Sequence, residues 1–469
     1  MDVLPDDVLL SVFGFCTNGI GINASQRGWQ TLVRVCRRWR NLVFGSPRGL
    51  NLQLICTERT RARDMLDVWP PLPLVIRSVP YYGGYTIKNV DNIVAVLERR
   101  NRVCQIHIYD IPSSLLEKVL AAMQEPFPEL TELTLHQNEK MIAVLPDSFL
   151  GGSAPRLQTL HFRGIPFPGL PKLLLSATHL VNLSLYRIPR SGYISPEAMV
   201  TVLSTMTSLD TLCLHFRSSR SFPDMASRRP PPSEPFVLPV LTEFEFEGVS
   251  EYLDVLITRI EAPRLFSLHI KFFNQTLFGS PPLVRFISRI PGLKAPEEAY
   301  LAFGDLSAIV KLSSPTSESN LIVRTRGNLI VEFSCRGLDQ LSSLKQVCTS
   351  RLLPLDLSVE NLYIYGTSFL GADRPDNVEN SLWLEIFQRF SAVKNLYLHP
   401  GLAQRIGPAL QELIEARMLD VLPTLRNIIL TGFQTSTPVQ EGIQQFVSMR
   451  QASYPIAISL WNTGFDYDD

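Results

Sequence analysis

The chain has 469 residues, 45% of them hydrophobic, and its 44 basic residues balance 44 acidic ones. This hydrophobic content excludes a globally disordered chain. The neutral balance argues against general nucleic-acid binding, which needs an excess of positive charge. No run of eighteen apolar residues occurs, so no transmembrane helix is expected. The first residues lack the basic region and apolar core of a secretory signal.

The seven cysteines lie far apart in the sequence and form no Cys-x-x-Cys pair. Scattered cysteines in odd number are typical of free thiols in a reducing compartment, and we expect most of them in the core. The sequence therefore predicts a cytoplasmic or nuclear protein that has no membrane partner.

Two short helices are expected near the N-terminus. Pro5 suits the first helical position, and Asp6 and Asp7 favour the positive end of the helix dipole. One apolar stripe on the first helix comprises Val8, Leu9, Val12 and Phe13. The second helix is expected to place on one side Leu32, Val35, Cys36, Trp39, Leu42 and Val43. Two such helices cannot bury these groups alone, so they need either the rest of this chain or a partner protein.

The strings LPDDVLL and VCRRWR in this region resemble an F-box, a helical module that docks a protein onto a Skp-type adaptor of a cullin-based ubiquitin ligase. The resemblance implies that residues 1–54 form this module. Its connection is longer than usual, because a stretch rich in Gly and Asn, 17–30, is inserted. The adaptor-binding residues that the resemblance implies are Leu4, Pro5, Val8, Leu9, Val12, Phe13, Leu32, Val35, Cys36 and Trp39.

A pattern of the form L-x-x-L-x-L recurs from residue 103 onward. Its copies start at residues 103, 130, 157, 180, 209, 241, 265, 359, 393 and 425. The spacing is close to that of leucine-rich repeats, in which each unit contributes one strand and one helix or turn. Helices are expected between strands at 113–123, 196–206 and 281–289. The predicted fold class is therefore α/β: a small all-α module, then an irregular leucine-rich-repeat-like solenoid with parallel strands on its concave face and helices outside.

The domain boundaries follow from this pattern. Residues 55–102 are expected to form a linker or cap, 103–292 the repeat array, and 359–469 the last repeats and a cap. Region 293–358 fits the repeat poorly, as an insertion or as degenerate repeats. It is expected to hold strands at 299–303, 307–312, 321–326 and 329–335 and a helix at 340–349. Residues 217–239 are expected to form a loop.

Three variable positions of each repeat point away from the core, onto the predicted concave face. Six of the seven histidines fall on this face, and His107, His136 and His161 can approach one another across adjacent strands. No carboxylate or thiolate stands at a matching position beside them, so no metal site is expected.

Acidic and aromatic residues on the same predicted face suit protein contacts. Three carboxylates share one strand, and His269 and Lys271 lie on the next. We hypothesise that a basic or mixed segment of a client protein binds at Glu243, Glu245, Glu247, His269, Tyr363, Tyr365 and Tyr397. A solvated strand without a partner is the alternative.

No motif in the sequence indicates catalysis. Residues 19–24 formally match a dinucleotide-binding pattern, but no strand is expected before them and no acidic residue follows at the required distance. No P-loop, H-E-x-x-H or G-x-S-x-G is present. Neither a catalytic residue nor a cofactor is therefore expected.

Nearly the whole chain resembles a large family of F-box proteins from mushroom-forming fungi, on strings that include VCRRWRNLVFGSPRGLNLQL, QLSSLKQVC and AVKNLYLHPGLAQRIGPALQEL. The resemblance implies a non-catalytic substrate receptor of a ubiquitin ligase. Its N-terminal module would bind a Skp-type adaptor, and through it a cullin, while the repeats bind a protein client. Two alternatives are a leucine-rich-repeat scaffold without a role in ubiquitylation and an enzyme with a site on the concave face.

Overall fold

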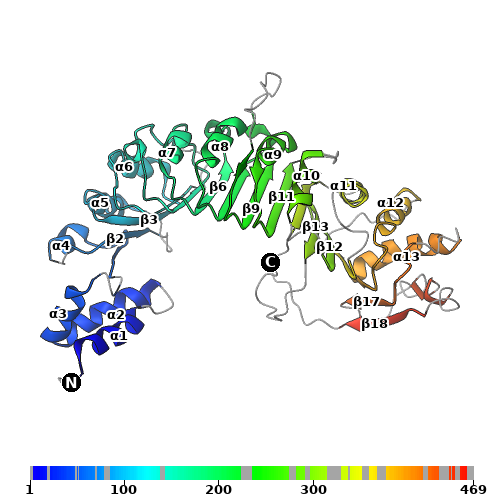
Figure 1. Cartoon of the computed structure of the whole chain (residues 1–469), viewed down its shortest axis with the longest axis horizontal. Helices are drawn as coiled ribbons and strands as arrows, with labels where there is room; N and C mark the ends of the chain where they lie inside the picture. Colours follow the sequence, from blue (N-terminus) through cyan, green and yellow to red (C-terminus); the bar gives the residue numbers. More distant parts are fainter. Residues whose placement is uncertain are drawn as a thin grey trace. The chain divides into compact units, whose positions relative to one another are not determined.

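The computed structural model describes residues 4–17, 22–47, 50, 52–68, 71–78, 85–137, 143–222, 235–273, 281–290, 296–313, 329–335, 338–350, 359–366, 377–415, 421–431, 443–444, 446–448 and 455–461. The chain divides into two compact units. The first unit comprises Met1–Leu209 and Arg220–Pro223, and the second comprises Asp210–Ser219 and Asp224–Asp469. Each unit contains its own helices and its own run of strands (Figure 1).

The first unit opens with three helices, α1 (Asp6–Thr17), α2 (Ile22–Val35) and α3 (Arg37–Gly45). The prediction of one helix through residues 32–43 was wrong, because the chain breaks at Cys36. Its backbone is extended, with φ −157° and ψ 171°, and its Sγ accepts the backbone N–H of Trp39 at 3.5 Å. This contact caps a free N–H group at the start of α3. Helix α2 takes up most of the Gly- and Asn-rich stretch 17–30.

Parallel strands in chain order form the rest of the first unit. They are β1 (Leu54–Cys56), β2 (Leu74–Ser78), β3 (Val103–Tyr109), β4 (Glu132–His136), β5 (Thr159–Arg163) and β6 (Asn182–Ile188). The helical segments that accompany them are α4 (Ala62–Leu66), α5 (Ile87–Leu97), α6 (Ser113–Ala122), η1 (Phe149–Gly152), α7 (Leu170–Ser176), η2 (Arg190–Gly192) and α8 (Pro196–Leu203). Strands β1 and β2 extend the sheet into 55–102, where a linker or cap was expected.

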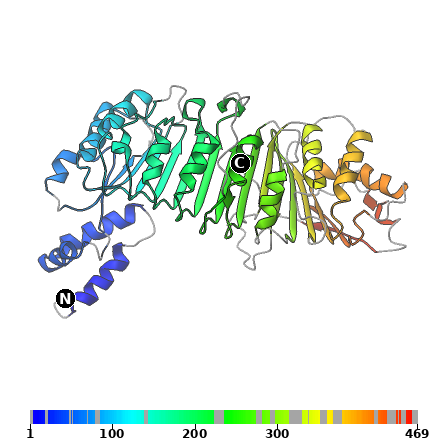
Figure 2. The ribbon, with the colours of Figure 1, turned by 45° about the horizontal axis from the view of Figure 1, so that its top comes forward.

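The second unit contains a longer run of strands, in the order β7-β9-β11-β14-β13-β12-β15-β16-β17-β18. Their bounds are β7 (Thr211–Phe216), β9 (Glu243–Gly248), β11 (Ser267–Phe273), β12 (Glu298–Phe303), β13 (Ala308–Ser313), β14 (Leu329–Ser334), β15 (Asn361–Gly366), β16 (Asn395–Leu398), β17 (Asn427–Thr431) and β18 (Ala457–Trp461). The accompanying helices are α9 (Ser250–Ile257), α10 (Pro281–Arg289), α11 (Leu338–Thr349), α12 (Asn377–Phe387) and α13 (Pro400–Glu415). The short helix η3 (Ser219–Ser221) spans the sequence boundary between the two units. Strands β8 (Phe236–Val237) and β10 (Ile260–Glu261) form a separate parallel pair. Figure 2 shows the strands of each unit running side by side.

The irregular region 293–358 is built into the sheet of the second unit. Strand β13 runs antiparallel to both β12 and β14. Strand β14 pairs in parallel with β11, and β12 pairs in parallel with β15. Three of the predicted strands and the predicted helix are therefore present, whereas the strand predicted at 321–326 lies outside the described residues.

The apolar positions of the repeat form the core, as predicted. Leu133, Leu160 and Leu183 are register partners on β4, β5 and β6, and all three are fully buried. Burying a leucine side chain in this way contributes about 1.5–3 kcal/mol relative to leaving it exposed. The repeat pattern thus gives a mixed α/β fold with a mostly parallel sheet, and it turns the variable positions of each strand to the opposite face.

We expect Gly164→Ala to lower the free energy of unfolding by about 1–3 kcal/mol. Gly164 follows β5 with φ +71°, and an added Cβ would collide with the carbonyl oxygen of Gln137. Urea denaturation followed by circular dichroism measures the change. Gly14→Ala in α1 is the control, because an added Cβ there has nothing within 4 Å. Equal stability of the Gly164→Ala variant and the native chain would contradict the expectation.

Candidate functional site

Helices α1, α2 and α3 share an apolar core of their own. Leu9, Phe13 and Leu32 are buried. The ring centroids of Phe13 and Trp39 lie 4.7 Å apart. Arg38 donates to Asp6 Oδ1 and to the carbonyl of Leu4, both at 2.6 Å, and so ties α3 to the start of α1. Three of the predicted adaptor-binding residues therefore hold the module together, since their side chains do not reach the surface.

A second apolar row runs along the outside of α1. We call it the exposed stripe; it comprises Leu4, Val8, Val12 and Phe15, which are 47%, 40%, 47% and 86% exposed. Within α1, spacings of four and three residues place Val8, Val12 and Phe15 on one side of the helix, and Leu4 precedes its first turn. Pro5, Val35 and Cys36 are also exposed, and Trp39 is half-buried. Sequence reasoning missed Phe15, although it follows Val12 by three residues.

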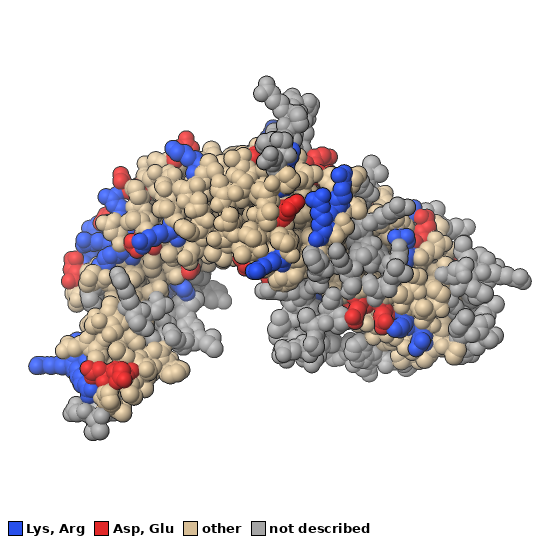
Figure 3. Space-filling model, viewed as in Figure 1, with Lys and Arg blue, Asp and Glu red and all other residues tan. Residues whose placement is uncertain are grey.

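Charged side chains of both signs surround the stripe. Figure 3 shows acidic and basic side chains next to one another on the α1–α3 module, where Arg38 pairs with Asp6. The Arg38–Asp6 pair is partly exposed, so its net contribution to stability is small. Its effect is geometric, because it fixes the beginning of the exposed stripe against α3.

Ring side chains from four adjacent strands of the first unit form a continuous row. We call it the ring ladder; it comprises Tyr109, His136, His161 and Tyr186 on β3, β4, β5 and β6. Successive ring centroids are 4.6, 4.6 and 5.0 Å apart. His136 and His161 thus approach each other, as the repeat register predicted. His107 instead has its Nδ1 3.3 Å from Thr134 Oγ1, and its Nε2 lies 3.6 Å from Glu132 Oε2.

Burial keeps the three histidines of this face neutral. It lowers the pKa of His107, His136 and His161 from 6.5 to about 4 each, because an imidazolium loses solvation inside the protein. Nearby cations add to the effect: Arg77 lowers the pKa of His107, and Arg163 lowers the pKa of both His136 and His161. The positive charge of this face at neutral pH therefore comes from arginines.

Strand β9 in the second unit carries the three predicted carboxylates, which alternate with buried phenylalanines. Two of them contact side chains from neighbouring strands. His215 Nε2 lies 3.4 Å from Glu245 Oε2, and its Nδ1 lies 3.6 Å from Glu247 Oε2. The hydrogen bond from His215 is the leading cause that lowers the pKa of Glu245. Glu243, Glu245 and Glu247 are all half-buried.

A cation and a fourth carboxylate complete this acidic group. Lys271 Nζ lies 3.0 Å from Glu332 Oε1 and 3.8 Å from Glu247 Oε1. His269 Nε2 lies 3.8 Å from Glu332 Oε2. Burial alone would raise the pKa of Glu332, but the neighbouring His269 and Lys271 side chains outweigh it and lower that pKa. Sequence reasoning missed Glu332, because the repeat pattern breaks where β14 pairs with β11.

The predicted tyrosines form a second cluster in the same unit. Tyr300, Tyr363 and Tyr397 stack face to face, with successive ring centroids 4.4 and 4.2 Å apart. The Tyr300 hydroxyl donates to Glu298 Oε2 at 2.8 Å. Tyr365 is exposed beside them. Strands β14 and β13 separate this cluster from β9 and β11, so the predicted client-binding residues fall into two groups.

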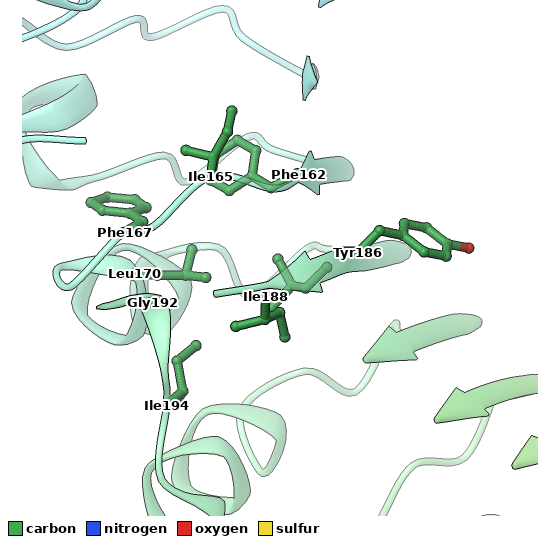
Figure 4. A pocket seen from close by; sticks show the side chains of 9 residues that line it. Phe162, Ile165, Phe167, Leu170, Tyr186, Ile188, Gly192 and Ile194 are labelled. Atoms are coloured by element: carbon green, nitrogen blue, oxygen red, sulfur yellow. The ribbon is translucent and has the colours of Figure 1, made fainter. Parts of the chain in front are cut away.

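The described parts of the chain contain a smaller and a larger hollow. The smaller one, about 10 Å³, is lined by Phe162, Ile165, Phe167, Leu170, Leu185, Tyr186, Ile188, Gly192 and Ile194 (Figure 4). It has room for about one water molecule, so it is a packing gap. The ring of Tyr186 points away from the other lining residues (Figure 4). The larger hollow, about 220 Å³, is lined by Val237, Ile260, Glu261, Ala262, Pro263, Phe286, Arg289 and Ile290.

The seven cysteines are distributed between the core and the surface. Of the seven free cysteines only Cys56, Cys213 and Cys348 are buried, so the expectation that most are core residues was wrong. Burial raises the pKa of Cys56 to about 11 and that of Cys348 to about 12, which leaves these thiols poorly nucleophilic at neutral pH. Within the described ranges, no three His, Cys, Asp or Glu side chains are grouped to hold a metal ion.

No helix in the described part of the chain combines the length and the apolar composition needed to span a bilayer.

Comparison with known proteins adds no assignment: no family model matches the chain, and no curated protein matches it. The exposed stripe and the outer face of the strands are therefore the features from which a function is inferred.

The stability of the first unit is expected to fall as the pH drops from about 6.5 to about 4. In this window the unfolded chain binds protons on His107, His136 and His161 that the folded chain does not. Their stabilising contribution is complete above pH 6.5 and is lost on acidification. Thermal melts across this range measure the effect. His136→Gln with His161→Gln is expected to flatten the pH dependence, whereas the exposed His179→Gln is expected to leave it unchanged.

Proposed function

We propose that this chain is the substrate-receptor subunit of a cullin-based ubiquitin ligase. In this proposal α1–α3 form an F-box that binds a Skp-type adaptor. The strands and helices that follow form a leucine-rich-repeat-like solenoid that binds a protein client. The observation that carries the proposal is the exposed stripe on α1. Contiguous apolar side chains on a soluble surface mark an interaction site.

The division of α1 into two apolar sides supports adaptor docking. Leu9 and Phe13 fill the core of the module, so the stripe on the other side of α1 is not needed to fold it. Exposed Val35 and Cys36, at the junction of α2 and α3, add to the surface that a partner could cover. The resemblance of LPDDVLL and VCRRWR to an F-box indicates a Skp-type adaptor as that partner.

The outer faces of the strands support client binding. Helices cover one side of parallel strands, so the variable positions remain available on the other. In the second unit this face offers an acidic group on β9 and exposed or half-buried tyrosines on β15 and β16. Tyrosines and charged groups in such rows suit protein contacts. The receptor would accelerate ubiquitylation by holding the client near the ligase's catalytic partner, through proximity.

Adaptor capture is tested with the double variant Val8→Glu, Val12→Glu. Both side chains are exposed, so the variant is expected to stay folded by circular dichroism. It is expected to bind a Skp-type adaptor at least about tenfold more weakly, because two charges would be desolvated at the interface. Leu175→Glu, which changes an exposed leucine on α7, is the matched control. Leu9→Glu would be a poor probe, since Leu9 is a core residue.

Undiminished capture by a folded double variant would contradict the proposed docking surface. If the native chain itself captures no adaptor, the scaffold without a ubiquitylation role becomes the better assignment.

Client binding is tested by charge reversal on β9. Glu243→Lys with Glu245→Lys is expected to lose client proteins whose ubiquitylation depends on the adaptor-bound native chain. Glu251→Lys, on the exposed side of α9, is expected to keep them. Quantitative ubiquitin-remnant proteomics compares the three chains. Identical ubiquitylation by all of them would remove β9 from the client site.

A further inference from the structure

We propose that the outer face of β2–β5 in the first unit binds a peptide segment rich in Asp and Glu. The inference rests on the proposed client-binding role of the strands, and it adds the chemistry of one bound segment. It concerns residues that are separate from the acidic group on β9.

Strand pairing brings two rows of cationic and ring side chains together on this face. Arg77 and His107 are register partners on β2 and β3, and the same row continues through Thr134 to His161. In the second row, His136 on β4 is the partner of Arg163 on β5. Arg163 is exposed and Arg77 is half-buried. Neighbouring parallel strands lie about 4.8 Å apart, so the rows form one patch.

Three polar atoms in this patch lack a hydrogen-bond partner. Arg77 Nε, His107 Nε2 and His136 Nε2 are buried and have no such partner among the described residues. A buried donor without a partner costs about 1–3 kcal/mol. Because these atoms are buried, a ligand carboxylate would instead meet the exposed guanidinium of Arg163 and the half-buried guanidinium of Arg77. The patch therefore offers two guanidinium groups to an anion.

The negative charge on this face is limited. Glu132 on β4 accepts from Gln105 Nε2 at 2.8 Å and lies near His107. Asp110 follows the end of β3, near Tyr85, whose pKa its charge helps to raise. The neutral groups of the patch are Thr134 and the rings of Tyr109 and Tyr186. Within the strands of this patch, Glu132 is thus the one carboxylate named beside two arginines and three histidines.

A peptide fits this surface better than a nucleic acid does. Nucleic-acid binding requires several Lys or Arg side chains that follow the phosphates, whereas this patch has two arginines. An extended peptide places alternate side chains on one side, at a spacing of about 6.6 Å. Carboxylates at that spacing can reach from Arg77 toward Arg163, while the ring ladder provides flat contact area for the peptide backbone.

Proton uptake gives the interaction a distinctive signature. The histidines are neutral in the free protein because burial lowers their pKa to about 4. A bound carboxylate raises these pKa values, since an opposite charge favours the protonated form. Proton uptake on binding would make the interaction tighten as the pH falls.

The test is fluorescence anisotropy of labelled octaglutamate with the full chain between pH 7.5 and pH 6.0. Binding is expected, and it is expected to tighten as the pH falls. Arg77→Gln with Arg163→Gln is expected to weaken it by at least about tenfold. His136→Gln with His161→Gln is expected to reduce its pH dependence. Arg190→Gln, which removes one exposed arginine outside the patch, is expected to bind like the native chain.

Three results would overturn the proposal: no octaglutamate binding at pH 6.0, equal binding by the double arginine variant, or preferential binding of a dodecathymidine oligonucleotide. None of these results affects capture of a Skp-type adaptor or the ubiquitylation that depends on β9. Failure of this inference is therefore distinguishable from failure of the proposed function.

Discussion

In-register pairing of parallel strands is the constraint on which both units depend. Each copy of the repeat offers apolar side chains that a single strand cannot bury, and the neighbouring strands bury them. The register that aligns Leu133 with Leu160 and Leu183 also aligns the side chains on the opposite face. Because a slip by one residue would exchange the two faces, packing of the core fixes the positions of every polar row. The ring ladder and the acidic group on β9 are consequences of that register.

The three helices at the N-terminus obey a different rule. A short helix can be apolar on two sides if one side fills its own core and the other meets a partner. In α1 the inner side is Leu9 and Phe13, and the outer side is the exposed stripe. Sequence periodicity cannot separate the two sides, because Val8 and Leu9 are equally apolar and adjacent. Only the positions of α2 and α3 decide which one is buried.

The regular repeats could be predicted from the sequence, and their strands and helices lie where the pattern placed them. Three features could not. The break at Cys36 depends on a sulfur cap that has no periodic signature. Strands β1 and β2 were missed because the full L-x-x-L-x-L string is not present there. The neighbours of Glu332 depend on β14 pairing with β11, a long-range choice that local sequence does not encode. For the same reason the charges around Lys271 were only partly foreseen.

The antiparallel strand β13 has a consequence for how the array could have grown. Strands β11 and β12 run in the same direction, and β14 and β13 lie between them in the sheet. Strand β14 runs in that direction too, whereas β13 runs in the opposite direction. A pair of added strands preserves the polarity of everything that follows, whereas a single added strand would reverse it. The β13–β14 pair therefore leaves the direction of the strands that follow it unchanged. Without this pair, β12 could pair with β11 in parallel. Lys271 would then lose the carboxylate of Glu332 as its ion-pair partner.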